Sequence, residues 1–190
     1  SAASDVYKRQ LHLGVVRERV RAERGRRVVG APDAHRRAAG GERLDLDETT
    51  IADLFKSAGY RTGAFGKWHN GSQYPHHPNG QGFDEFLGFC AGHWNNYFDT
   101  TLDHNGQMVP SKGFMIDAVT DAAIEFIEKN KTKPFFCYLP YNTPHTPWQV
   151  PDKYFQKYMA MGIEDPKVAC AYAMVENIDD NMGRVLAKLE

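Results

Sequence analysis

The chain has 190 residues, is 42% hydrophobic and 12% aromatic, and carries a net charge of −1. That length suffices for a domain with a buried core, and a charge this small excludes a global field that would recruit nucleic acid or a membrane surface. No apolar run approaches the ~20 residues that cross a bilayer. We therefore expect no nucleic-acid partner and no membrane span.

The three cysteines are an odd number, and no C-x-x-C motif occurs. This count argues against a disulfide framework and against a cysteine zinc site. Cys137 lies in an apolar run and Cys170 in a helical pattern, so we expect both to be buried as small hydrophobic residues.

The composition changes abruptly near residue 43. Residues 1–43 hold ten of the twelve arginines but one of the 23 aromatic residues, and their charge is 11 − 5 = +6, against 12 − 19 = −7 for residues 44–190. A basic arm, a disordered linker and a stretch of non-native sequence are three interpretations of residues 1–43. Too little apolar surface is available there to offset chain ordering, so we expect this segment not to pack on the domain at 44–190.

The first expected element of that domain is a helix within residues 44–60. Asp47 is the predicted N-cap and Gly59 the predicted stop after the helix. The expected apolar stripe consists of Ile51, Leu54 and Phe55.

A short strand at 60–67 follows, and a loop rich in Gly, Pro, Asn and His then extends over residues 66–86. Asn105-Gly106 predicts the turn of a hairpin. A second helix should end near Lys131, with Ile116, Val119, Ala123 and Ile127 on its apolar face.

Residues 134–141 form a continuous apolar run, which is typical of a buried strand in a parallel sheet. A third helix should begin near Pro166, with an apolar stripe of Ala171, Val175, Ile178, Met182, Val185 and Leu189. This alternation of helices and strands predicts an α/β fold with a mainly parallel sheet. The stripe is still running at Glu190, from which we expect a truncated chain.

Lys67 and His69 directly follow the strand at 60–67, where α/β folds place ligands. Two apart in an extended segment, they point the same way. A fixed cation beside a group that titrates near neutrality suits an anionic substrate that needs proton transfer. A surface loop with a buried tryptophan is the alternative.

His145 follows the strand at 134–141 and stands between Pro144 and Pro147, which restrict the backbone. A rigidly held histidine at a strand end suits an acid or base, and a proline-rich turn with an incidental histidine is the alternative.

Weaker candidates are explained better by ordinary structure. These are a metal site at His76-His77, a ligand-like run at 103–106 that fits a hairpin tip, and Asp179-Asp180 on a solvated helix face. His93 and Trp94 could line a substrate pocket, but the sequence does not decide this.

The segments TIADLFKSAGYRTGAFGKWHNG, GFDEFLG and KPFFCYLPYNTPHTP resemble the sulfatase family in order and spacing. The resemblance covers most of the chain, from about Glu42 to Glu190. It implies a fragment of an alkaline-phosphatase-like fold and the hydrolysis of sulfate esters of small molecules or carbohydrates.

The same resemblance implies roles for three residues. Lys67 would contact the sulfate and the nucleophile's oxygen, His69 would help remove a proton during sulfate release, and His145 would lie by the leaving-group oxygen. Lys67 and His145 would thus also bind substrate. We expect all three to converge on one pocket. The complete family member is expected to be exported.

The chain departs from the family in its nucleophile and metal site. Sulfatases use a formylglycine made from Cys or Ser in C/S-x-P-x-R, together with a divalent cation, usually Ca²⁺. No such motif occurs in this sequence, and no metal ligand is assigned, so we expect an inactive fragment. A phosphate mono- or diester hydrolase of the same superfamily and a non-catalytic anion-binding module are the alternatives.

Overall fold

The computed structural model describes residues 43–190. The segment predicted not to pack on the domain therefore lies, apart from Arg43, outside the described residues, and that prediction stays open.

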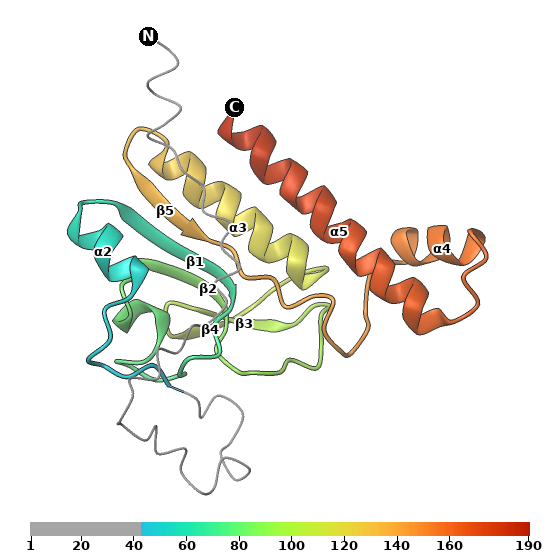
Figure 1. The fold of residues 1–190 in the computed structure, drawn as a ribbon, viewed down its shortest axis with the longest axis horizontal. Coiled ribbons are helices and arrows are strands. Elements are labelled where there is room, and N and C mark those ends of the chain that lie inside the picture. The colour runs from blue at the N-terminus through green and yellow to red at the C-terminus, as the bar shows by residue number, and fades with distance from the viewer. Residues whose placement is uncertain (1–42) are drawn as a thin grey trace, which may run out of the picture.

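The described chain forms a five-stranded sheet with strand order β4-β3-β2-β1-β5 (Figure 1). The strands are β1 (Arg61–Lys67), β2 (Glu85–Phe89), β3 (Thr101–His104), β4 (Gln107–Pro110) and β5 (Phe135–Tyr138). β1 pairs in parallel with β2 and β5, whereas β3 and β4 extend the sheet as an antiparallel hairpin beyond β2. The parallel part therefore consists of the three strands β2, β1 and β5.

Four α-helices and one 3₁₀ turn flank the sheet. They are α2 (Ile51–Ser57), η2 (Pro78–Gly80), α3 (Met115–Asn130), α4 (Asp152–Ala160) and α5 (Pro166–Leu189). α3 lies against β1, α5 packs along α3, and α4 packs on the amino-terminal part of α5 (Figure 1). This mixed arrangement confirms the α/β fold expected from the sequence.

Alternating side chains of the strands supply two cores, one on each face of the sheet. Phe65 and Phe135 belong to the core under α3 and α5, while Ala64 and Phe136 belong to the core under α2. The three cysteines are buried. A sheet covered on both faces explains why β5 is a continuous apolar run and why all of β1 between its two end residues is buried.

The first helix begins later than predicted. Thr50, not Asp47, is the N-cap, and Thr50 and Asp53 form a capping box in which each side chain accepts from the other's backbone N–H. The predicted apolar stripe is wrong for Ile51 and Leu54, which are 46% and 59% exposed, and right for Phe55, which packs with buried Ala52 against the core. Gly59 follows the helix with φ +84°, as expected.

The predicted face of the third helix is only partly right, because Val185 is buried in the core and Leu189 packs against it, as expected. α5 buries Asn177 and Asn181, whereas Val175 of the predicted stripe is exposed. The amides of Asn177 and Asn181 donate to Asp117 Oδ1 on α3 at 2.9 and 2.7 Å. Hydrogen bonds thus pair polar groups at a helix interface that apolar periodicity cannot predict.

Two further elements were missed. β2 begins at the end of the segment interpreted as loop, and α4 was not expected at all. Within the described residues, no helix is long and apolar enough to cross a membrane.

Candidate active site

The three parallel strands end at one edge of the sheet, and each is followed there by candidate residues. β1 ends at Lys67 and leads to His69, β2 leads to residues 90–93, and β5 leads to residues 139–147. Ligands of open α/β sheets bind beyond the carboxyl ends of parallel strands. The strand register therefore brings segments that are far apart in sequence to a common edge.

Lys67 is fixed by close contacts between the ends of β1 and β5. Its backbone N–H donates to Pro140 O at 2.9 Å, and a Cβ on the preceding Gly66 would lie 2.3 Å from the same oxygen. Gly66 also has φ +133°, which side chains rarely adopt. Burial lowers the pKa of the Lys67 ammonium group, because the charged form is desolvated. A bound anion at this place would favour the charged form.

His69 lies in the left-handed region, with φ 60°. Non-glycine residues in this region are uncommon and concentrate at functional sites. The neighbouring Trp68 is buried, and its Nε1 donates to His76 O at 2.9 Å. This hydrogen bond ties the segment that carries His69 to the loop at His76. The imidazole of His69 lies directly against Gly92, since a Cβ there would be 2.2 Å from His69 Nε2.

His145 is exposed, and its ring is oriented by its own backbone. Nδ1 lies 2.6 Å from Thr146 O, so Nδ1 donates and Nε2 is left to face a ligand. The hydroxyl of buried Tyr97 donates to His145 O and Thr146 O, each at 3.1 Å. Tyr97 therefore holds the turn that carries His145.

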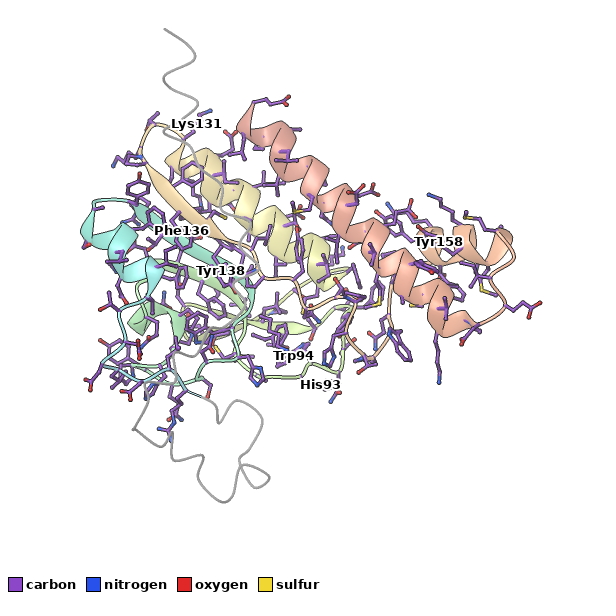
Figure 2. All side chains as sticks on the ribbon, in the orientation of Figure 1. His93, Trp94, Lys131, Phe136, Tyr138 and Tyr158 are labelled. Carbon is purple, nitrogen blue, oxygen red and sulfur yellow. The ribbon has the colours of Figure 1, made fainter. Side chains whose placement is uncertain are left out.

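The loop after β2 joins the two predicted clusters. The imidazole of His69 packs against Gly92. The ring centroid of the next residue, His93, lies 5.2 Å from that of His145. Figure 2 shows His93 and Trp94 close together, at the end of the molecule away from Lys131, which follows α3. His69 and His145 thus flank two consecutive residues of one loop.

His93 is the residue whose place the sequence could not decide. The apolar run Phe86–Phe89 could have predicted its place. Read as a third parallel strand, this run would have placed the following loop, with His93, at the same edge of the sheet. Within that loop, His93 Nε2 lies 2.8 Å from Asn95 Oδ1.

A second cluster of potential ligands includes Cys90, which directly follows β2. The potential ligand atoms of His77, Cys90 and Asp103 are within 4.8 Å of one another. His77 Nδ1 accepts from Asn79 N–H at 3.2 Å, so Nε2 carries the proton and donates to Asp103 Oδ2 at 3.1 Å. Burial, with a contribution from Asp103, raises the pKa of Cys90 to about 12. With this tautomer the cluster is a buried hydrogen-bonded pair beside a neutral thiol.

The remaining weak candidates have structural roles. Asn105 and Gly106, with φ 54° and 86°, form the predicted hairpin turn, and Asp103 Oδ1 accepts from Gly106 N. Asp180 Oδ2 accepts from Tyr154 Oη at 2.7 Å, whereas Asp179 is exposed.

The sulfatase family model matches residues 27–190. Among curated proteins, the chain is 34% identical over 174 residues to the uncharacterized sulfatase YdeN of Escherichia coli, covering 77% of this chain and 30% of that protein. It is 35% identical over 104 residues to the N-acetylglucosamine-6-O-sulfatase of Bacteroides thetaiotaomicron, covering 54% of this chain and 18% of that protein.

Solved structures agree. Ps i-CgsB in complex with k-i-k-neocarrahexaose is 34% identical with a TM-score of 0.72, covering 77% of this chain and 37% of that chain. The PsFucS1 sulfatase from Pseudoalteromonas sp., at 20% identity and TM-score 0.59, shares the fold over 79% of this chain and 37% of its own.

The chain thus belongs to the sulfatase family of sulfate ester hydrolases and has part of their alkaline-phosphatase-like fold. It spans about 30% of the length of its Escherichia coli relative.

Proposed function

We propose that this chain forms the sulfate-binding side of a sulfatase active centre whose substrates are sulfated saccharides. The observation that carries the proposal is the meeting of three strand ends, with Lys67 on the central strand and the loop at 92–93 between His69 and His145. Among the relatives, one is an N-acetylglucosamine-6-O-sulfatase and one solved structure is a complex with k-i-k-neocarrahexaose.

In this proposal each residue performs a distinct step. Lys67 binds the sulfate oxygens as a partly desolvated cation, where electrostatic attraction exceeds that in water. His69 moves a proton when sulfate is released. His145, as an imidazolium protonated on Nε2 as well as on Nδ1, donates from Nε2 to the leaving-group oxygen. All three donors converge on charge that develops in the transition state.

The Ca²⁺ ion and the formylglycine expected in the complete enzyme remain part of the proposal. Ca²⁺ takes oxygen ligands, whereas Lys67, His69 and His145 offer nitrogen donors, so these residues do not fit as its ligands. We assign no step to either group within this chain.

Titration with inorganic sulfate tests the proposal directly. The imidazole C–H resonances of His69 and His145 should shift together in NMR spectra of the 190-residue chain. Lys67→Ala should weaken sulfate binding at least tenfold, which is about 1.4 kcal/mol. Lys133→Ala is the matched control, because Lys133 is exposed and precedes β5, at the opposite edge of the sheet. Equal losses in both variants, or unperturbed imidazoles, would refute it.

A further inference from the structure

A hollow of about 450 Å³ is lined by Phe98 and by residues within 148–155 and 166–170. Phe98, Trp148 and Phe155 contribute aromatic walls, while Lys167 and Asp152 contribute opposite charges. Its volume falls within the range of pockets that hold small ligands, and its lining combines apolar walls with a few polar groups, as such pockets do.

The hollow and the proposed site are built from the same two segments. Trp148 is three residues after His145, so their Cα atoms are at most about 11 Å apart, the reach of three extended residues. Gln149, which also lines the hollow, accepts from Tyr97 N–H at 2.9 Å and donates to Asn95 O at 3.1 Å. The wall of the hollow therefore lies within reach of a ligand that extends past His145.

The lining chemistry indicates what would occupy it. Trp148 is 40% exposed, although large aromatic residues are mostly buried. The Lys167 ammonium group lies 5.7 Å from the centre of its ring. An aromatic surface suits the apolar C–H face of a sugar ring, the Asp152 carboxylate accepts from hydroxyl groups, and a lysine binds an anionic substituent as a point charge.

We propose that this hollow is a binding subsite for a second, anionic sugar ring of an oligosaccharide whose sulfated ring occupies the Lys67–His69–His145 site. The inference rests on the proposed function and deepens it, because it makes the substrate a chain of sugars instead of a single ring. Trp148 and Lys167 become specificity residues that do not touch the reacting sulfate.

The test compares ligands of different length on the 190-residue chain. Carrageenan and chondroitin sulfate hexasaccharides, and the corresponding sulfated monosaccharides, are titrated while the three tryptophan indole N–H signals are followed by NMR. Trp148→Phe assigns the signal of Trp148. The hexasaccharides should shift that signal, whereas the monosaccharides should leave it unchanged.

Variants separate this subsite from the sulfate site. Trp148→Ala and Lys167→Ala should each weaken hexasaccharide binding at least fivefold and leave monosaccharide binding unchanged, whereas Lys67→Ala should weaken both. Tyr172→Ala and Lys133→Ala are matched controls, because both residues are exposed and neither lines the hollow. Circular dichroism checks that each variant is folded.

Each remaining outcome is decisive. If Trp148→Ala and Lys167→Ala keep full hexasaccharide affinity, or if no hexasaccharide shifts the Trp148 signal, the subsite is overturned while the sulfate site stands. If both variants weaken monosaccharide binding equally, the hollow is not a separate subsite. If Lys67→Ala changes nothing, the proposed function itself fails.

Discussion

At the scale of the residue, Lys67 combines a functional charge with partial burial at the end of β1. Burial lowers the pKa of its ammonium group in the folded state, so the unfolded state binds more protons between the folded pKa and the unfolded value near 10.4. Stability then rises with pH across that window, and below it the full desolvation cost opposes folding.

We therefore expect Lys67→Met, which keeps the apolar stem, to be more stable than the parent chain at pH 7. The advantage should shrink as the pH approaches 10, where the parent lysine is increasingly neutral. Urea unfolding at both pH values measures this difference. A variant that is less stable at pH 7 would show that the ammonium group makes a net stabilising contact.

Gly92 controls the position of His69 without touching a ligand itself. A Cβ at Gly92 would lie 2.2 Å from His69 Nε2, and the imidazole can move away more easily than backbone could. Gly92→Ala should thus weaken sulfate binding about tenfold, by displacing the ring, with a loss of stability of about 1 kcal/mol or less. NMR titration and thermal unfolding of the same sample separate the two effects.

Gly183→Ala serves as the control for that substitution. Gly183 is exposed in α5, and nothing lies within 4 Å of a Cβ built there. Its replacement should stabilise the chain by about 0.5–1 kcal/mol through backbone entropy and leave sulfate binding unchanged. Equal losses of sulfate binding in both alanine variants would contradict the role of Gly92.

At the scale of the element, a buried polar network holds α5 on α3. Asn181 is 1% exposed, and its amide donates to Asp117 Oδ1. Asn181→Ala should cost about 1–3 kcal/mol, because the carboxylate loses a charge-assisted hydrogen bond at a buried interface. Chemical denaturation checks the value. Asp179→Ala on the exposed face should change stability by less than about 0.5 kcal/mol, and a similar loss there would argue against the network.

Elements with a local signal were predictable. β1, β5 and α3 carry strong apolar patterns, and Asn105-Gly106 has the chemistry of its turn, so these appear where expected. β2 was missed because its five residues directly follow a segment rich in Gly, Pro and Asn. That omission also hid the third loop of the candidate site.

At the scale of the whole molecule, the chain contains the proposed sulfate-binding residues but no C/S-x-P-x-R nucleophile motif. We expect the purified 190-residue chain to show no turnover of an aryl sulfate, since anion binding alone does not replace a nucleophile. The assay compares the chain with Lys67→Ala, and turnover above that background would require a nucleophile within these residues.

The local sequence was enough to predict the family and the α/β class, which are confirmed, and to name three candidate site residues, whose roles stay a prediction. Motif residues and their spacing are properties of short segments, and strand–loop patterns place them without a three-dimensional structure. Lys67, His69 and His145 could be named for that reason.

The residues that contact them could not be predicted from the sequence, because these contacts arise from long-range packing. Gly92 against His69, His93 beside His145, and Asp117 between Asn177 and Asn181 all join segments at least 23 residues apart. Such contacts depend on strand order and helix docking, which no local window contains. Strand pairing and side-chain packing, summed over the whole domain, determine which loops share the edge of the sheet.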